Sequence, residues 1–403
     1  MILYFIGLTE SYEGEGYDRK NLKIPQNQEK LLAEIAETVG KDNIAAISFG
    51  GAPMDFSFEK NVGAILHMYL GGQAVGESVA DLISGEVNPS GKLAETIPFS
   101  EKDTPAWRYF APPNDDVEYR ESIFVGYRYY ETFHVPVKYP FGYGLSYTSF
   151  SYSELNVSEV YSGGKIQIRF KIKNIGKVSG AEIAQLYVCP NESDVIRSHI
   201  ELKGFQKIYL HPGEEKEVIL ELDERSFSVY DVEKKAFSML SGKYQICIGA
   251  SVHDLQLKAN IEVVGNSYFR NERELFPDYF REQPHGMEIS AEQFYQLLGG
   301  EPKHDKEKKR GEYTVYDSYQ DVVNVSMFGK FVRGIVHIGL KIMLRGKSER
   351  DPAFKMVKMG VEEGNLEGLI ATSGGIATPK LIDMLVYNAN KKYLQAFKRL
   401  LKK

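Results

Sequence analysis

The chain has 403 residues, 43% of them hydrophobic and 26% charged, which predicts two or three globular domains and excludes a disordered chain. Its charge is uneven: residues 1–265 hold 26 basic and 37 acidic groups, a net of −11, whereas residues 266–403 hold 23 and 18, a net of +5. An acidic body argues against nucleic acid as the partner. No stretch approaches the roughly 20 continuous apolar residues of a membrane span, so a membrane partner is not expected either.

The cysteine content points to a reducing compartment. Cys189 and Cys247 are the two cysteines, and both fall in predicted strands. Buried, reduced thiols are the preferred interpretation, and they fit a cytosolic protein. The first six residues lack the basic lead and the cleavage site of a signal peptide, so we expect a cytoplasmic location. No cysteines and histidines have the spacing of metal ligands, and neither a metal nor a cofactor is expected.

A loop rich in glycine and glutamate follows the first predicted strand. Residues 2–6, Ile-Leu-Tyr-Phe-Ile, form an apolar run that indicates a buried strand. Residues 7–19, GLTESYEGEGYDR, then place Glu13 and Glu15 beside glycines, where the chain can bend sharply. Open α/β sheets place ligands at the carboxyl ends of strands, so one of these glutamates could act as a general acid. The alternative is a solvated acidic turn with no catalytic role.

The residues after this loop predict a βαβ unit. Pro25 stands where a helix begins, and Gly40 stands where it ends. Residues 44–49 form a second buried strand, and a right-handed crossover joins it to the first. Residues 62–69 and 73–83 are predicted to be helical.

Two motifs further along are interpreted as structural. Asn-Pro-Ser-Gly at residues 88–91 has the composition of a turn, and a plain connector is the preferred interpretation. Residues 101–150 are rich in loops and aromatic residues. Residues 140–147, PFGYGLSY, are predicted to pack against other parts of the chain, with contact to a sugar as the alternative.

From Phe150 the hydrophobic period changes to two. In residues 166–173 isoleucine and phenylalanine alternate with glutamine, arginine and lysine, which predicts a half-buried strand. Further strands are predicted at residues 182–188, 217–222, 243–249 and 255–264. Several short strands separated by Pro-Gly, Ser-Gly and Asn-Ile-Gly turns are typical of an antiparallel β-sandwich.

The last third of the chain is polar and then helical. Residues 266–320 are predicted to be a polar linker, because they end in the charged run at 303–310. Between residues 327 and 345 a helical pattern carries a stripe of basic side chains: Lys330, Arg333, His337, Lys341 and Arg345. The stripe could face a membrane surface or an anionic partner, but packing of the apolar side onto a neighbouring helix is the preferred interpretation. The final helix is predicted to begin at Thr378-Pro379.

Six segments occur in an order that resembles one enzyme family. They are GLTESYEGEGYDR, LKIPQNQEKLL, GGAPMDF, NPSGKLAETIPFS, FVGYRYYETF and YPFGYGLSYTSF. Together they resemble glycoside hydrolase family three, the β-glucosidase and β-xylosidase family, from the first residue to about Gly265. A weaker similarity to the C-terminal extension of clostridial-type members covers the rest. The family arranges a TIM barrel, an α/β sandwich and a fibronectin-III-like domain in that order, and this chain begins within the α/β sandwich.

The resemblance implies a fold class of α/β plus all-β. Residues 1–150 are expected to form a partial α/β sandwich domain with connecting loops, and residues 151–265 a fibronectin type III-like β-sandwich. The polar linker at 266–320 and a helical C-terminal extension at 321–403 complete the expected domains. The substrate implied is a β-linked glucoside or xyloside, as a small oligosaccharide or an aryl glycoside.

The resemblance also assigns one half of a catalytic pair. The family's nucleophile is an aspartate, usually followed by tryptophan, on the barrel; here the single tryptophan, Trp107, follows Ala106. The acid/base carboxyl of the family comes from the loop that holds Glu13 and Glu15. The Gly-Tyr-Asp-Arg motif selects Glu15, whereas counting from the end of the strand selects Glu13. Asp18 and Arg19 are expected to lock the loop through a charged hydrogen bond.

Three functions fit these features. The chain is expected to be the C-terminal part of a retaining β-glycosidase of β-glucosidase type, which supplies the acid/base glutamate but not the nucleophile and is inactive alone. Its barrel would then be encoded elsewhere, for example as a separate partner chain. The alternative is a non-catalytic accessory module that binds carbohydrate or protein through its fibronectin-like domain. A degenerate, inactive remnant is the third interpretation, and intact motifs over 265 residues argue against it.

Overall fold

The structure is a computed structural model that divides into two compact units. The first unit consists of residues 1–5 and 22–302, and the second of residues 6–21 and 303–403. Each unit is described by itself. The residues that the structure describes are 1–10, 12–14, 19, 21–110, 117–265, 271–302, 308–343, 345, 351–362, 364–373 and 375–401.

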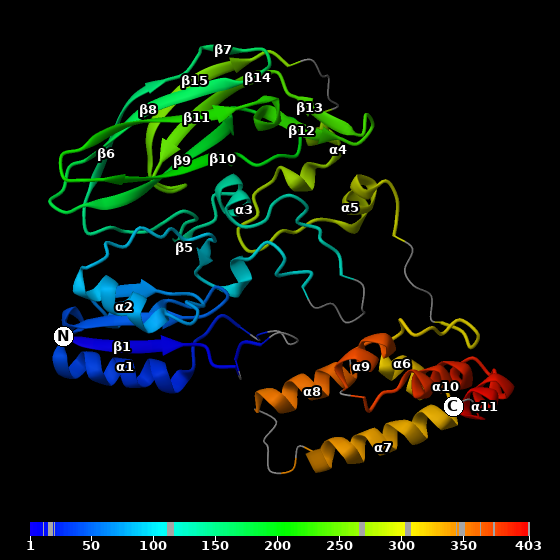
Figure 1. Cartoon of the computed structure of the whole chain (residues 1–403). Helices are drawn as coiled ribbons and strands as arrows, with labels where there is room; N and C mark the ends of the chain where they lie inside the picture. Colours follow the sequence, from blue (N-terminus) through cyan, green and yellow to red (C-terminus); the bar gives the residue numbers. More distant parts are fainter. Residues whose placement is uncertain are drawn as a thin grey trace. The chain divides into compact units, whose positions relative to one another are not determined.

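A three-stranded sheet forms the N-terminal part (Figure 1). Its order is β1 (Ile2–Gly7), β2 (Ile44–Phe49), β3 (Ala64–His67), and β2 and β3 are parallel. Helix α1 (Gln26–Val39) begins after Pro25 and ends at Gly40, where φ is 79°, as predicted. Its Leu32 is fully buried, and α2 (Val75–Ser84) follows β3.

Two predictions for this sheet were wrong. Residues 64–67 form strand β3 and not a helix, because a short apolar run between glycines fits either structure until a neighbouring strand pairs with it. Strand β1 is not buried on both faces: Tyr4 and Ile6 are buried, but Leu3 is 39% and Phe5 58% exposed. Successive side chains of a strand point to opposite faces, and the described residues cover only one face of β1.

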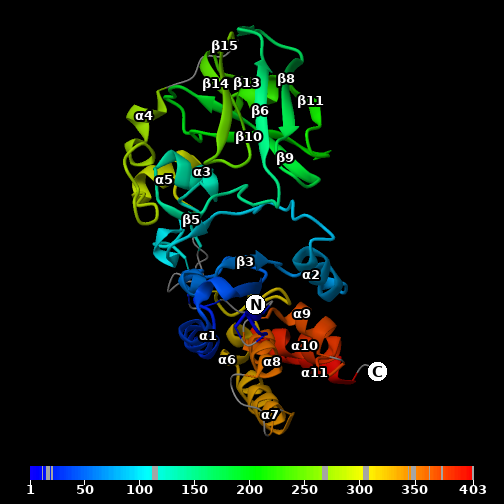
Figure 2. The ribbon, with the colours of Figure 1, turned by 90° about the vertical axis from the view of Figure 1, so that its left-hand side faces the viewer.

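The β-sandwich packs two antiparallel sheets face to face (Figures 1 and 2). The three-stranded sheet has the order β11 (Glu215–Leu222), β8 (Ile166–Asn174), β6 (Phe150–Asn156). The five-stranded sheet has the order β10 (Glu201–Leu210), β9 (Gly180–Pro190), β14 (Gly242–Gly249), β15 (Leu255–Val263), β7 (Val160–Tyr161), in which β7 pairs parallel. Ile168, Phe170 and Ile172 are buried between the sheets, which confirms the predicted alternation.

Two further pairs of short strands accompany these sheets. β12 (Ser228–Asp231) pairs with β13 (Ala236–Met239), and β4 (Ile97–Pro98) pairs with β5 (Val137–Tyr139), in both cases antiparallel. Cys189 and Cys247 lie in neighbouring strands as buried free thiols, with their sulfur atoms 3.7 Å apart. The predicted state of both thiols is therefore the one found in the structure.

Asn88 joins the α/β part to the sandwich. Its side-chain amide donates to the Ser179 carbonyl at 3.0 Å, and its side-chain oxygen accepts from the Ser146 hydroxyl and the Tyr147 N–H at 3.0 and 2.8 Å. A Cβ atom on Gly144 would lie 2.3 Å from the Gly91 carbonyl oxygen, so this close approach requires glycine. We call these contacts the Asn88 seam. The motifs at 88–91 and 140–147 are therefore two sides of one packing contact.

Where the sequence predicted a polar linker, residues 271–302 are folded. They contain α4 (Glu272–Leu275) and α5 (Ala291–Leu298), and α3 (Tyr127–Thr132) lies against them. Phe276, Tyr279 and Met287 are buried in a cluster with Phe124 and Tyr129. Apolar residues spaced irregularly along a polar segment show no helical or strand period, so the burial depends on partners about 150 residues away in the sequence.

The second unit holds a group of helices. They are α6 (Tyr319–Asn324), α7 (Met327–Met343), α8 (Pro352–Glu362), α9 (Leu366–Thr372), α10 (Pro379–Ala389) and α11 (Tyr393–Leu401). Val322, Leu366 and Leu385 are buried in their common core. Helix α10 begins as predicted, since the Thr378 hydroxyl accepts the Leu381 N–H at 3.2 Å. It was predicted to be the final helix, but it ends at Ala389, and α11 is a separate helix. No described helix is long and apolar enough to cross a membrane.

Candidate functional site

The loop after β1 carries the carboxylates that the sequence singled out. A tight turn opens it: the N–H groups of Tyr12 and Glu13 donate to the Thr9 carbonyl at 2.8 and 3.0 Å. This turn fixes the backbone at Glu13, whose side chain is half-buried. Glu15 and Asp18 lie outside the described residues, so the predicted roles of both stay predictions.

Arg19 interacts electrostatically with Glu13. Burial lowers the pKa of the Arg19 guanidinium, and the negative charge of Glu13 opposes that shift. A half-buried carboxylate and a guanidinium six residues apart therefore stabilise each other's charge across the turn. The sequence predicted that Arg19 would lock the loop, and the described partner in this interaction is Glu13.

A second polar group lies where β2 and β3 end. Ser48 and His67 are register partners on these parallel strands, and Ser48 Oγ lies 2.9 Å from His67 Nδ1. Burial lowers the pKa of His67 to about 4, so its imidazole is neutral at pH 7. The ring of Tyr69 packs 4.1 Å from the ring of His67, and its φ of 50° is unusual for a residue other than glycine.

Glu95 completes this polar group. Burial raises the pKa of the Glu95 carboxyl, and its interaction with the Tyr69 hydroxyl opposes the shift. Burial likewise raises the pKa of Tyr69, with the charge of Glu95 adding to it. The group therefore combines a neutral imidazole, a neutral phenol and a carboxyl that holds its proton more firmly than usual. Such side chains can exchange hydrogen bonds with hydroxyl groups.

Sequence reasoning missed this group. The only available signal was position: Ser48 and His67 each stand at the end of a predicted apolar segment, where α/β sheets place polar side chains. Because residues 62–69 were predicted to be helical, His67 was not assigned to the edge of the sheet.

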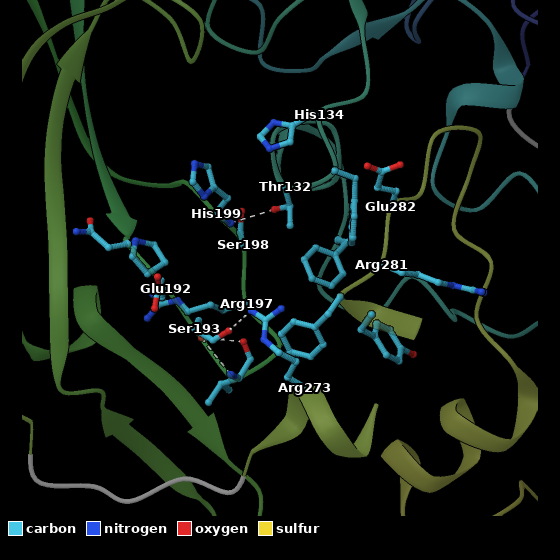
Figure 3. Close-up of a pocket in the computed structure, with 17 residues that line it drawn as sticks. Thr132, His134, Glu192, Ser193, Arg197, Ser198, His199, Arg273, Arg281 and Glu282 are labelled. Atoms are coloured by element: carbon cyan, nitrogen blue, oxygen red, sulfur yellow. Dashed lines mark hydrogen bonds between the residues drawn. The ribbon is translucent and has the colours of Figure 1, made fainter. Parts of the chain in front are cut away.

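A cavity of about 360 Å³ lies between the sandwich, α3 and the segment after α4 (Figure 3). Its three arginines, Arg197, Arg273 and Arg281, each form an ion pair within the protein. Arg197 donates to Glu201 at 3.0 Å and to the Tyr244 hydroxyl at 3.2 Å, and the His199 N–H donates to the Thr132 hydroxyl at 3.0 Å. In Figure 3 the Arg281 side chain extends away from the cavity.

Glu13 does not line this cavity, and Glu15 lies outside the described residues. We therefore interpret the cavity as a structural junction and not as the catalytic site. Among the described residues no group of three His, Cys, Asp or Glu side chains could hold a metal ion.

The architecture by itself indicates a class of protein. It joins a sheet with parallel strands, which carries an acidic loop at the end of its first strand, to a fibronectin-type sandwich. Residues 1–147 match the glycosyl hydrolase family 3 C-terminal domain, and residues 182–252 match the fibronectin type III-like domain. These matches confirm the resemblance to glycoside hydrolase family 3 that the order of the motifs predicted.

Several relatives are β-glucosidases or related glycosidases. The thermostable β-glucosidase B of Acetivibrio thermocellus is 45% identical over 261 residues, which cover 64% of this chain and 34% of that relative. An exo-α-(1→6)-L-arabinopyranosidase of Bifidobacterium breve is 37% identical over 266 residues, covering 66% and 35%. The chain thus spans about a third of the length of these relatives.

Solved structures of β-glucosidases also match this chain. A family 3 β-glucosidase of Bifidobacterium adolescentis superposes with a TM-score of 0.63 at 37% identity, covering 66% of this chain and 39% of that one. A β-glucosidase of Kluyveromyces marxianus in complex with glucose superposes with a TM-score of 0.61 at 35% identity, covering 66% and 32%. The matched 66% of the chain corresponds to the C-terminal part of the family fold, and the described residues contain no barrel among their sheets.

Proposed function

We propose that this chain forms the C-terminal part of a retaining β-glycosidase of β-glucosidase type. In this proposal the loop after β1 supplies the acid/base carboxyl, Glu15, and the nucleophile comes from a barrel outside this sequence. The observation that carries the proposal is the match of residues 1–147 to the family 3 C-terminal domain with a two-glutamate loop directly after β1.

Retaining hydrolysis needs two carboxyl groups on either side of the glycosidic bond, about 5–5.5 Å apart. The acid protonates the leaving oxygen while the nucleophile attacks the anomeric carbon; the same residue then removes a proton from the attacking water. Glycines on both sides of Glu15 allow the backbone to bend, which can place such an acid against a sugar. The family's Asp-Trp nucleophile motif has no counterpart here, because Trp107 follows Ala106.

The interaction with Arg19 favours Glu15 over Glu13. Glu13 interacts with the half-buried Arg19 guanidinium of its own loop, whereas a general acid must face the leaving oxygen of the substrate. Glu13 is therefore assigned the structural role in the loop, and Glu15 is the acid that the Gly-Tyr-Asp-Arg motif selects.

The proposed substrate is a terminal β-linked glucoside or xyloside. Support comes from relatives named as β-glucosidases and from a solved structure of one with glucose bound. The proposed partner is a family 3 barrel, either fused ahead of Met1 or supplied as a separate chain. The polar group around His67 and Glu95 adds hydrogen-bonding capacity at the edge of the sheet where α/β proteins bind ligands.

The test compares Glu15→Ala with Glu13→Ala after a family 3 barrel has been supplied. Loss of the acid should slow hydrolysis of substrates with poor leaving groups by about 10²–10⁴-fold, and activated aryl glycosides far less, because activated groups leave without a proton. Azide should partly restore turnover in Glu15→Ala by attacking the glycosyl intermediate.

Leaving-group dependence and azide rescue in Glu13→Ala, but not in Glu15→Ala, would move the assignment by two residues. If neither variant shows them, the loop is structural. Failure of every barrel to produce hydrolysis with the unmodified chain would favour the alternative, a non-catalytic module.

A further inference from the structure

Helix α7 presents three different faces around its circumference. Successive residues of an α-helix are rotated by about 100°, so the side chains of Met327–Met343 can be assigned to sectors. Val332 and Val336 lie in the sector that packs into the core of the second unit. Figures 1 and 2 both show α7 at the edge of the group of helices.

A second sector of α7 is apolar and exposed. The exposed fractions are 90% for Met327, 65% for Phe331, 54% for Ile335, 62% for Ile338 and 69% for Ile342. At about 100° per residue these five side chains fall within an arc of about 80°, so they form one continuous stripe. We call it the α7 stripe. The expected packing onto a neighbouring helix accounts for Val332 and Val336 but leaves this stripe uncovered by the described residues.

The third sector of α7 is cationic and adjoins the stripe. Lys330, Arg333, His337 and Lys341 occupy it, and Arg345 follows just beyond the helix. Residues 327–345 contain no aspartate or glutamate, in a region whose net charge is +5. A core-facing helix needs one apolar sector; this helix has a second apolar sector beside a wholly cationic one.

Helix α11 repeats the pattern on a smaller scale. Its exposed apolar residues are Tyr393, Leu394, Phe397, Leu400 and Leu401. Lys391 and Lys392 precede the helix and Lys398 lies within it. The second unit therefore exposes two apolar stripes, each accompanied by lysines.

We propose that α7 binds the surface of an anionic membrane, with the α7 stripe buried at the acyl boundary and its cations against the lipid phosphates. An exposed apolar stripe next to a cationic sector is the pattern of helices that lie in the membrane interface. Charge complementarity decides the occupant: anionic headgroups match a helix that carries only positive charge. From the sequence, a membrane surface was only the less favoured interpretation of the basic side chains, because exposure of the α7 stripe depends on how the helices pack.

The test is co-sedimentation of the full 403-residue chain with vesicles. Vesicles that contain phosphatidylglycerol should bind the chain, and pure phosphatidylcholine vesicles should not. Binding should weaken as salt is raised from about 0.1 M to about 0.5 M. Ile338→Glu should reduce the partition coefficient at least about tenfold, and the double variant Lys330→Gln, Lys341→Gln roughly 30-fold.

Matched controls are available in the sandwich. Ile175 is 60% exposed, so Ile175→Glu makes the same change on a surface of similar exposure, and Lys177→Gln with Lys207→Gln matches the change of charge. These controls should leave vesicle binding unaltered.

Absence of binding to phosphatidylglycerol vesicles at low salt would overturn the proposal. Binding that survives Ile338→Glu would also overturn it, because another surface would then be responsible. Self-association that Ile338→Glu abolishes, without vesicle binding, would identify a second copy of the chain as the occupant and reject the membrane.

Discussion

The β-sandwich and the three-stranded N-terminal sheet differ in how far their apolar faces are buried. In the sandwich the inner faces are buried against each other, as for Ile168 and Phe170, and the outer faces carry charged pairs such as Lys165–Glu221 at 2.9 Å. In the three-stranded sheet, β1 buries Tyr4 and Ile6 but leaves Leu3 and Phe5 exposed.

The difference is that the apolar faces of the sandwich are covered, whereas one apolar face of the three-stranded sheet is exposed. The sandwich buries its inner apolar faces with its own strands. The exposed face of β1 and its place at the end of the strand order leave both an apolar surface and a free edge. Such a surface is stabilised when more structure covers it, which agrees with a chain that spans about a third of its relatives.

The largest expected effect concerns activity. The purified 403-residue chain should hydrolyse no aryl β-glucoside or β-xyloside, because a lone acid cannot form the glycosyl intermediate. Release of nitrophenol from the aryl glycosides, followed with and without a family 3 barrel, measures this. Retaining turnover by the chain alone would show that the open sheet already holds a complete site.

The next effect compares one phenylalanine from each sheet. Phe170→Ala should lower the free energy of unfolding by about 3–5 kcal/mol, because it leaves a cavity between two closed sheets. Phe5→Ala, at a side chain 58% exposed, should change it by less than about 0.5 kcal/mol. Urea unfolding of both variants measures the contrast. Equal losses would mean that β1 is covered in solution, for example by self-association.

A smaller effect is expected at the Asn88 seam. Asn88→Ala removes three hydrogen bonds and leaves the Ser179 carbonyl and the Tyr147 N–H without this partner, which should cost about 2–3 kcal/mol. Asn156→Ala, at an exposed strand end, is the control and should be close to neutral. Thermal unfolding of the full chain distinguishes the two. A neutral Asn88→Ala would reduce the seam to a plain connector, as the sequence suggested.

The smallest effect depends on pH. The folded pKa of His67 is about 4, below its unfolded value of about 6.5, so the unfolded chain binds more protons between these values. The contribution of neutral His67 is therefore fully present above pH 6.5 and is lost as the pH falls toward 4, by roughly 1–2 kcal/mol. His67→Gln should flatten this part of the stability profile. An unchanged profile in that variant would place the titration elsewhere.

Periodicity predicted the sandwich well, because alternation at residues 166–173 and turn residues are local signals. Motif order predicted the family and the position of the acidic loop. Strand β3 was missed because its four residues carry too little period to separate strand from helix. The folded segment at 271–302 was missed because Phe276 and Tyr279 are buried by Phe124 and Tyr129, far away in the sequence.

The candidate site was predicted less completely than the fold. The loop motif named Glu13 and Glu15, but the interaction between Glu13 and Arg19 depends on how the turn at Thr9 folds back. The polar group of Ser48, His67 and Glu95 comes from three separate segments, so no short sequence motif predicts it.

The Asn88 seam has a consequence for recombination between family members. A chimaera that exchanges the sandwich at Phe150 would separate Asn88 from the Ser179 carbonyl that it contacts, and it would pair surfaces that had not been selected together. Residues 88–91 and 140–148 thus form a linkage group with the sandwich, although they precede it in the chain. Domain exchange should retain both segments with the sandwich that they contact, so the useful crossover point lies ahead of Asn88.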